Sequence, residues 1–321
     1  MDLEKKANEL ICQAGRIAVA CHLSPDGDTL GAGLALWHGL RALGKEAKVF
    51  CDDPVPKQYG FLPGQEEVSV YRGDWVPELF ITVDAADAFR TGAIEPYLIQ
   101  AIPCINIDHH ASNPLYGTVN IVEGGASSTC QVMAAFLESI GVATNHAIAT
   151  CLYVGLLTDT DRFSYASTTP ETLRVAATLL GYGVDVATIT QTIYRTNRLS
   201  HLRLLAEAIR GLALFDEDSI GVSAIPRSVF TACGAEKEDM EGIIYHILTV
   251  ETLKIAVVMK ETADGGQWKV SFRSKGQVAI DQVASAFGGG GHRNAAGCMV
   301  QGDLSQARQA ILDMIREKAT R

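Results

Sequence analysis

Acidic and imidazole side chains occur at four separate places in the sequence, each at the end of an apolar segment of strand or helix length. The four groups are His22-x-x-x-Asp26-x-Asp28, Asp84 with Asp87, Asp108-His109-His110, and Asp159 with Asp161. A single aspartate after a strand is usually a turn residue or a helix cap. Four such groups at equivalent places favour one shared site, because side chains that follow parallel strands meet at the same edge of a sheet.

Carboxylates gathered at one edge would repel one another, and some would have to stay protonated at neutral pH. Divalent cations remove this penalty, and a nearby cation also favours an acid at the end of a helix, such as Asp159. Carboxylate and imidazole ligands without thiolates suit Mn²⁺ best, with Mg²⁺, Fe²⁺, Co²⁺ or Zn²⁺ as substitutes. The sequence therefore predicts a site for two divalent metal ions.

The elements that must position these groups follow an α/β pattern. Strand-like and helix-like segments alternate in the first half, which predicts a mostly parallel sheet flanked by helices. Short apolar runs there are expected to be strands that are buried on both faces. The expected strands are 16–21, 48–51, 79–83 and 102–107, and the expected helices are 29–43, 128–140, 147–157, 170–180 and 200–212.

The second half predicts a smaller, mixed α/β domain. Its strand-like runs are 219–225, 253–259 and 268–272, and its helical runs are 240–248 and 304–318. The polar, arginine-rich stretch between the two halves suits a connector. We therefore expect a catalytic domain at 1–186, a helical connector at 187–212 and a substrate-binding domain at 213–321. Arg195, Arg198 and Arg203 of the connector could face a substrate, or could equally be solvated surface charges.

A glycine-rich stretch, FGGGGHRNAAG at 287–297, is the strongest feature of the second domain. Consecutive glycines let a backbone approach a ligand and offer N–H groups to an anion. A flexible linker is the alternative, but linkers rarely lie between tight apolar runs. His292 and Arg293 add donors to the stretch, and Arg273 with Ser274 ends a predicted strand nearby in the sequence.

Length and charge limit the classes of function. The chain has 321 residues, which favours two domains, and a formal net charge of -10. Such a charge disfavours binding to long nucleic acid, because that binding depends on Lys and Arg side chains that neutralise phosphates. The start of the chain does not read as a secretory signal, and the apolar run 147–157 is too short to span a bilayer. We expect a cytoplasmic protein without a membrane partner.

The eight cysteines do not add to the predicted site. They are scattered from Cys12 to Cys298 and have no Cys-x-x-Cys spacing. This distribution argues against a disulfide framework and against a thiolate zinc site, and it predicts that most of the thiols are small buried groups.

The four motifs, in the forms His22-Leu-Ser-Pro-Asp26-Gly-Asp28, Asp84 with Asp87, Asp108-His109-His110 and Thr158-Asp159-Thr160, resemble those of DHH phosphoesterases. The run of four glycines before His292 resembles the DHHA1 signature. The likeness extends over about residues 18–300 and is closest to the oligoribonuclease A group, which degrades very short RNA and has pAp phosphatase activity.

This resemblance implies a role for each candidate residue. One cation would be held by His22, Asp26 and Asp84, and the other by Asp28, Asp84, His109 and Asp159. Asp108 would orient a histidine, and His110 would point toward the substrate phosphate as a donor or proton shuttle, unless it only caps a turn. The substrate would be bound by Arg273, Ser274, Gly289, Gly290, Gly291, His292 and Arg293.

The expected function is hydrolysis of RNA oligonucleotides of two to a few nucleotides to mononucleotides, with pAp as a further small substrate. A cyclic-dinucleotide or pGpG phosphodiesterase is the alternative enzyme, and a nucleotide sensor without catalysis is the alternative from another class. A single-strand DNA exonuclease would need a basic track with stacking aromatics, and a pyrophosphatase of the same superfamily would lack the glycine-rich stretch. Members of the family also support dimers, so a homodimer is among the expectations.

Overall fold

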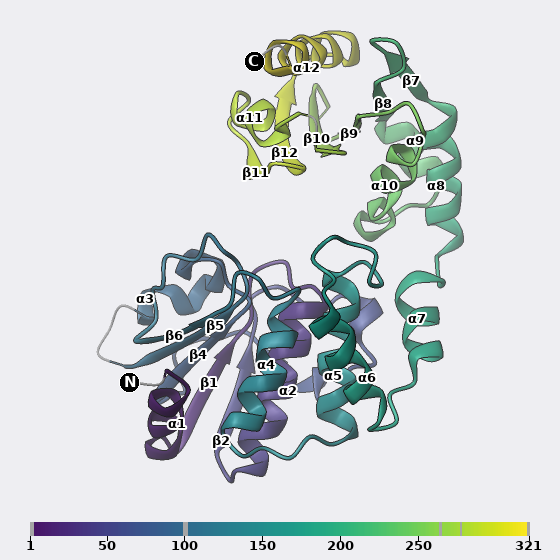
Figure 1. Cartoon of the computed structure of the whole chain (residues 1–321). Coiled ribbons are helices and arrows are strands. Elements are labelled where there is room, and N and C mark those ends of the chain that lie inside the picture. The colour runs from purple at the N-terminus through teal and green to yellow at the C-terminus, as the bar shows by residue number, and fades with distance from the viewer. Residues whose placement is uncertain (1–2, 99–101, 263–264, 277, 320–321) are drawn as a thin grey trace. The chain divides into compact units, whose positions relative to one another are not determined.

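The computed structural model describes residues 3–98, 102–262, 265–276 and 278–319, and the chain divides into two compact units (Figure 1). Unit 1 is Met1–Arg195 and unit 2 is Thr196–Arg321. The expected connector at 187–212 spans this division. Helix α7 (Val186–Tyr194) packs into the core of unit 1, whereas α8 (Leu199–Arg210) packs into the core of unit 2.

Unit 1 contains a six-stranded sheet in the order β3-β2-β1-β4-β5-β6, and all of its strand pairs are parallel. The strands are β1 (Arg16–Ala20), β2 (Glu46–Phe50), β3 (Val68–Ser69), β4 (Leu79–Val83), β5 (Cys104–Asp108) and β6 (Val119–Val122). The chain first adds strands on one side of β1 and then returns to add β4 on its other side. The sheet therefore has a switch point between β1 and β4, where ligands bind in folds of this kind.

Helices cover both faces of this sheet, as the predicted fold class requires. The helices of unit 1 besides α7 are α1 (Leu3–Gln13), α2 (Gly27–Ala42), α3 (Glu95–Leu98), α4 (Thr129–Ser139), α5 (His146–Asp159) and α6 (Pro170–Leu180). The larger core cluster lies between the sheet and helices α1, α2, α4 and α5. A smaller cluster around Phe50 and Phe80 lies on the opposite face, beside α3.

Close helix packing brings the ends of α2 and α5 together. A Cβ atom at Gly31 of α2 would overlap the carbonyl oxygen of Cys151 in α5. A Cβ at Gly155 of α5 would overlap the sulfur of Cys130 and lie 2.7 Å from Asp28 Oδ1. Glycine is needed at both positions because neighbouring atoms leave no room for a side chain.

Unit 2 contains a mixed six-stranded sheet in the order β11-β12-β10-β9-β8-β7, in which β8 and β9 pair in parallel and the other pairs are antiparallel. Its strands are β7 (Leu212–Phe215), β8 (Ile220–Ile225), β9 (Ile255–Glu261), β10 (Gln267–Ser274), β11 (Gly290–His292) and β12 (Ala295–Gln301). Its helices besides α8 are α9 (Arg227–Ala232), α10 (Ile243–Leu248), α11 (Ile280–Ser285) and α12 (Leu304–Ala319). The predicted fold class, a parallel α/β domain followed by a mixed one, is confirmed.

Two other sequence expectations can be compared with the structure. All eight cysteines lie among the described residues and are free, and every one except Cys12 is buried. Within the described ranges, no helix has the length and apolar character that a bilayer crossing requires.

Candidate metal centre

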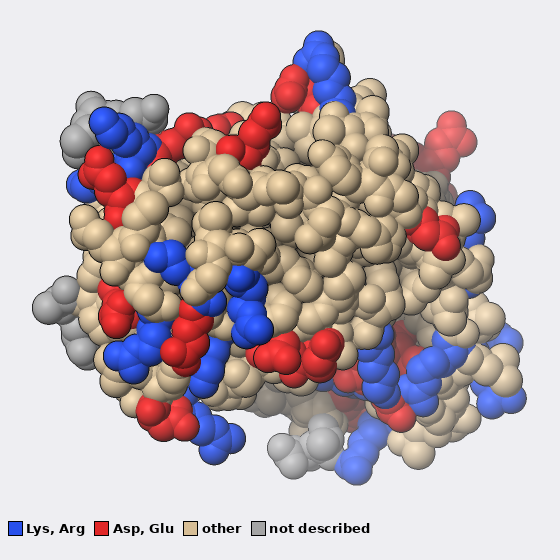
Figure 2. All heavy atoms as spheres, turned by 90° about the horizontal axis from the view of Figure 1, so that it is seen from below, with Lys and Arg blue, Asp and Glu red and all other residues tan. Residues whose placement is uncertain are grey.

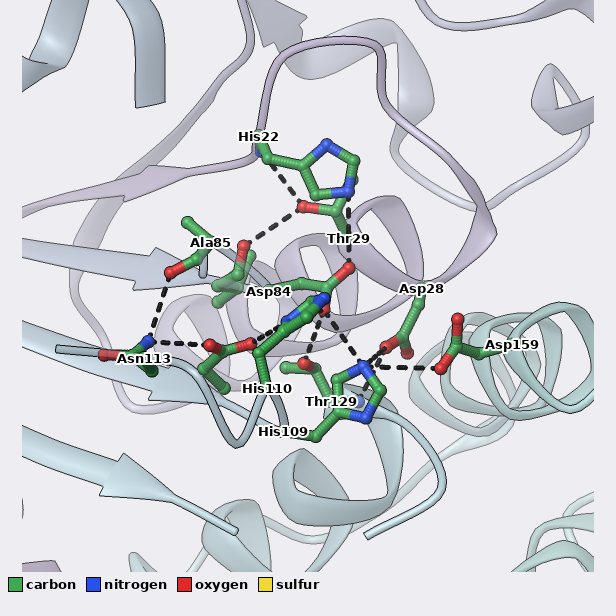
Figure 3. Close-up of polar contacts among 12 residues, drawn as sticks. His22, Asp28, Thr29, Asp84, Ala85, His109, His110, Asn113, Thr129 and Asp159 are labelled. Atoms are coloured by element: carbon green, nitrogen blue, oxygen red, sulfur yellow. Dashed lines mark hydrogen bonds and ion pairs between the residues drawn. The ribbon is translucent and has the colours of Figure 1, made fainter. Parts of the chain in front are cut away.

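Segments far apart in the sequence bring acidic and imidazole side chains together at the carboxyl edge of the parallel sheet (Figure 3). His22 follows β1, Asp84 follows β4 and His109 follows β5, so all three come from the strands around the switch point. Asp159 is the last residue of α5. Nitrogen and oxygen atoms suitable for a metal lie within 4.8 Å of one another in three groups: His22, Asp26 and Asp84; Asp28, His109 and Asp159; Asp84, His109 and His110.

The first group is built around His22. Its Nε2 lies 3.6 Å from Asp26 Oδ2 and 3.3 Å from Asp84 Oδ2. Its Nδ1 lies 2.8 Å from the carbonyl oxygen of Leu23, which can accept only if Nδ1 carries the proton. In this tautomer the Nε2 lone pair faces the two carboxylates. Arg90 Nη2 lies 2.9 Å from Nδ1 and 3.4 Å from the Leu23 oxygen. Because Nδ1 carries a proton, the arginine donates to the Leu23 carbonyl.

The second group repeats this arrangement around His109. Its Nδ1 lies 3.3 Å from the carbonyl oxygen of Ala126, so Nδ1–H donates there and Nε2 is left with a lone pair. Nε2 lies 3.3 Å from Asp159 Oδ2, 3.6 Å from Asp84 Oδ1 and 3.9 Å from Asp28 Oδ2. Each imidazole therefore presents one free nitrogen to several carboxylates, and this donor set fits a divalent cation.

Asp84 belongs to both arrangements. Its Oδ2 faces the Nε2 of His22, and its Oδ1 faces the Nε2 of His109. The residue has a left-handed backbone with φ of 56° directly after β4. Aspartate is one of the few non-glycine residues that tolerate this region. The carboxylate is buried and its two oxygens point in different directions, as a ligand shared by two cations requires.

Backbone N–H groups hold the other two aspartates of the first motif. Asp26 caps α2 and accepts from the N–H groups of Asp28 and Thr29 through Oδ1, so its Oδ2 is left for the cluster. Asp28 is buried and accepts 2.6 Å and 2.9 Å hydrogen bonds from the N–H groups of Thr129 and Cys130. The motifs did not predict these partners. The only available signal was Ser128, a typical helix cap, ahead of them.

Asp108 and His110 form a hydrogen-bonded pair next to these ligands, and His110 also belongs to the third group, with Asp84 and His109. The Nδ1 of His110 donates to Asp108 Oδ1 over 2.8 Å, and Asn113 Nδ2 donates to Asp108 Oδ2 over 2.6 Å. Asp108 thus orients His110, whereas the ring of His109 is held by a backbone carbonyl. The remaining motif acids are outside the three groups: Asp87 caps a short 3-10 helix, and Asp161 pairs with Arg162.

Comparison with known proteins identifies the family. The family model described as "DHH family, N-terminal domain" matches residues 16–156, and the one described as "DHHA1 domain" matches residues 226–321. The bifunctional oligoribonuclease and PAP phosphatase NrnA of Thermus thermophilus is 37% identical over 96% of this chain and 91% of its own length. The chain belongs to the DHH family.

Two further comparisons agree with this assignment. The Bacillus subtilis bifunctional oligoribonuclease and PAP phosphatase NrnA is 27% identical over 87% of each chain. An exopolyphosphatase-related protein of Bacteroides fragilis superposes with a TM-score of 0.93 at 22% identity, covering 99% of this chain and 96% of that one, which shows a common fold. The prediction that the chain is a phosphoesterase with DHH and DHHA1 domains is confirmed.

The electrostatics of the DHH site favour bound positive charge. Burial, followed by the charge of Asp84, raises the pKa of Asp28 to about 7. Burial, followed by the charge of Asp28, raises the pKa of Asp159 to about 7 as well. Burial by itself would lower the pKa of His22. Without a cation, however, a proton on Nε2 can be shared with Asp26 and Asp84, and these hydrogen bonds raise that pKa to about 10. Protons therefore concentrate here in the metal-free protein.

These shifts predict that the metal-free protein becomes more stable as the pH falls from about 7.5 to about 5.5. In this window the folded chain binds protons at Asp28 and Asp159 that the unfolded chain, with carboxyl pKa values of ~4, does not bind. His22 acts in the same direction above its ordinary pKa, because only the folded chain keeps it charged. Melting temperatures measured with a chelator at three pH values test this. The dependence of the melting temperature on pH should be weaker in Asp159→Asn. A melting temperature that rises with pH in the natural chain would contradict the prediction.

The residues predicted to bind substrate lie in unit 2, on and around the DHHA1 sheet. Arg273 is on β10, and its Nε donates to the hydroxyl of Tyr245 over 3.0 Å. Ser274 is buried, and its hydroxyl oxygen accepts from the N–H of Gly276. Gly290 and Gly291 are in β11, two strands away from β10, and Arg293 is exposed in the following turn. The side chain of His292 lies outside the described part of the structure.

The glycines of this stretch differ in what surrounds them. A Cβ at Gly289 would overlap the carbonyl oxygen of Gly297, and one at Gly291 would overlap that of Ala295. At Gly290 a Cβ would meet nothing within 4 Å. Gly289 and Gly291 are therefore needed for the close packing of this segment on β12, whatever they do for a ligand.

Alanine substitutions should separate the structural glycines from the free one. We expect Gly289→Ala to destabilise unit 2 by about 1–3 kcal/mol, because the new methyl group overpacks against backbone. Gly290→Ala should leave the melting temperature unchanged. The measurement is thermal unfolding of the two variants side by side. Equal destabilisation would contradict the difference in surroundings between Gly289 and Gly290. Because it keeps the fold, Gly290→Ala also tests substrate binding cleanly.

Proposed function

We propose that this DHH protein is a two-metal phosphodiesterase that hydrolyses short RNA oligonucleotides to mononucleotides and also removes the 3′-phosphate of pAp. The names of the Thermus and Bacillus relatives support the substrates. The observation that carries the chemistry is Asp84, which turns one carboxylate oxygen toward the free nitrogen of each imidazole.

The donor set fits two divalent cations. We propose that His22, Asp26 and Asp84 hold one ion and that Asp28, Asp84, His109 and Asp159 hold the other. Mn²⁺ is the proposed metal, because the ligands are carboxylates and imidazoles without a thiolate. When bound, two such ions supply Lewis acidity toward phosphoryl oxygens and an activated water as nucleophile.

The remaining residues of the site orient the reacting groups. Asp108 holds the Nδ1 of His110, so the Nε2 of this ring is left for a ligand. Because Asp108 is kept ionised by two donors, it also favours the charged form of His110 and raises its pKa. We propose that His110 donates a hydrogen bond or a proton to the substrate phosphate or the leaving oxygen.

Substrate binding is proposed for the DHHA1 unit through Arg273, Ser274, Gly289, Gly290, Gly291, His292 and Arg293. Arg273 is the strongest of these, since its guanidinium lies 5.1 Å from the ring centre of Tyr245 and is held there by the tyrosine hydroxyl. A guanidinium held in this way can bind a phosphate with its remaining N–H groups.

Short substrates are favoured by the charge of the protein. Figure 2 shows a face on which basic side chains alternate with acidic ones around a broad area without charge, so this face has no continuous basic track. With a net charge of -10, weak binding of long strands is the expected result. A cytoplasmic location and a homodimer stay predictions from the sequence.

A substrate panel in Mn²⁺ tests the proposal. It compares 5′-phosphorylated dinucleotides, longer RNA, pAp, cyclic dinucleotides, pGpG and pyrophosphate. We expect the dinucleotides and pAp to be hydrolysed and long RNA to react slowly. Preferred hydrolysis of cyclic dinucleotides or of pGpG alone would favour the alternative phosphodiesterase, and binding without turnover would favour a nucleotide sensor. Consumption of pyrophosphate alone would overturn the nucleotide assignment.

A further inference from the structure

The first turn of α4 contacts two of the proposed ligands at once. Thr129 is fully buried, and its hydroxyl donates to Asp84 Oδ1 over 2.8 Å. Its backbone N–H donates to Asp28 Oδ2 over 2.6 Å. Thr129, which the sequence motifs do not include, therefore connects an aspartate in the first turn of α2 with one that follows β4 (Figure 3).

The hydroxyl of Thr129 fixes the rotation of the Asp84 carboxylate. The oxygen that accepts from Thr129 is the one that lies 3.6 Å from His109 Nε2, and the other oxygen lies 3.3 Å from His22 Nε2. A carboxylate free to turn about its Cβ–Cγ bond would lose this alignment. The hydrogen bond holds the plane in the orientation in which each oxygen faces one imidazole.

Thr129 also lets two buried negative charges stay close together. Asp28 and Asp84 are both buried, so neither carboxylate is stabilised by bulk water. Donors at the start of a helix stabilise carboxylates that would otherwise turn apart or protonate. The side chain and N–H of Thr129 supply one such donor to each aspartate.

We propose that Thr129 is a positioning residue that sets the affinity of the His109 side of the centre for its cation, acting through Asp84 and Asp28. The proposal rests on the two-metal site proposed above. The His22 side should depend on Thr129 less, because His22 and Asp26 have their own backbone partners.

The test compares Thr129→Ala with Thr129→Ser, a pair that differs only in the hydroxyl group. Mn²⁺ is titrated into chelator-treated full-length protein, without substrate, by calorimetry and by electron paramagnetic resonance. We expect Thr129→Ala to bind one of its two ions about 10–100-fold more weakly, as the loss of an outer hydrogen bond to a ligand commonly does. The spectrum of the coupled ion pair should weaken accordingly. Thr129→Ser should bind both ions as the natural chain does.

Ser128→Ala is the matched control, since Ser128 caps the same helix through Gln131 and contacts neither aspartate. It should lower the melting temperature and leave Mn²⁺ affinity unchanged. If Thr129→Ala bound Mn²⁺ as the natural chain does, or if both alanine variants lost affinity equally, the proposed positioning role of Thr129 would be contradicted. If the natural chain itself bound no Mn²⁺, the proposed two-metal function would fail instead. If circular dichroism shows that Thr129→Ala does not fold, Thr129→Val is used in its place, because valine has a volume similar to that of threonine.

Discussion

Asp84→Asn is expected to lower kcat for a 5′-phosphorylated dinucleotide by at least about 1,000-fold, equivalent to ~4 kcal/mol of transition-state stabilisation. Both oxygens of Asp84 are used in the structure, one toward His22 and one toward His109. An amide keeps one oxygen and replaces the other by an NH₂ group, which repels a cation. The substitution should therefore disturb both proposed metal positions at once.

Asparagine is the sharper replacement because it should not disturb the fold. It has the size of aspartate and also tolerates the left-handed backbone at this position, where φ is 56°. Alanine would add strain of about 1–2 kcal/mol in the same backbone conformation. Initial rates at saturating Mn²⁺, with circular dichroism as a check on folding, are the measurement.

Asp161→Asn serves as the matched control for this experiment. Asp161 is also an aspartate with a left-handed backbone at the edge of the site, but its carboxylate pairs with Arg162 instead of the imidazoles. Its turnover should stay close to that of the natural chain. Undiminished turnover in Asp84→Asn would mean that Asp84 does not bridge two cations.

Mn²⁺ is expected to raise the melting temperature of unit 1 by about 10–20 °C over the value in a chelator. A ligand at 100 times its dissociation constant stabilises a folded protein by ~2.7 kcal/mol per site, so two sites give about 5 kcal/mol. A domain of about 150–250 residues shifts by roughly 2–4 °C for each kcal/mol. Relief of the repulsion among buried carboxylates is the physical source of this effect.

Without metal, Asp84→Asn is expected to have a higher melting temperature than the natural chain. Burial raises the pKa of Asp84, so its charged form is unfavourable in the metal-free chain and a neutral amide should raise the melting temperature there. Asp84→Asn should also lose most of the shift caused by Mn²⁺. Differential scanning fluorimetry with chelator or Mn²⁺ measures both quantities. A full Mn²⁺ shift in Asp84→Asn would place the stabilising ions elsewhere.

Much of the fold follows from local patterns in the sequence. The strand at 79–83 and the helix at 170–180 have the predicted bounds, and the other predicted elements of unit 1 differ by a few residues. Several elements were missed. β3 has only two residues, and β11 has the sequence Gly-Gly-His, so neither has a run of apolar side chains by which a strand is recognised. These strands form because a neighbouring strand offers hydrogen bonds.

The outer partners of the site were also beyond sequence reasoning. Thr129 and the carbonyl of Ala126 contact groups that are distant in sequence, and backbone donors or acceptors have no residue type that marks them. The glycine-rich stretch is a second case in which the sequence pattern does not identify the contact partner. Its pattern indicates close approach, but the structure shows that Gly289 and Gly291 approach β12.

The sequence by itself determined which side chains could meet. A residue that follows a parallel strand can lie only at the carboxyl edge of the sheet, so His22, Asp84 and His109 were expected together. Only the tertiary structure decided how they meet: which oxygen of Asp84 faces which imidazole, and that Asp108 orients His110. These pairings depend on strand order and on the packing of α4 and α5 against α2. The contacts of Asp84 join residues far apart along the chain, so local spacing does not encode them.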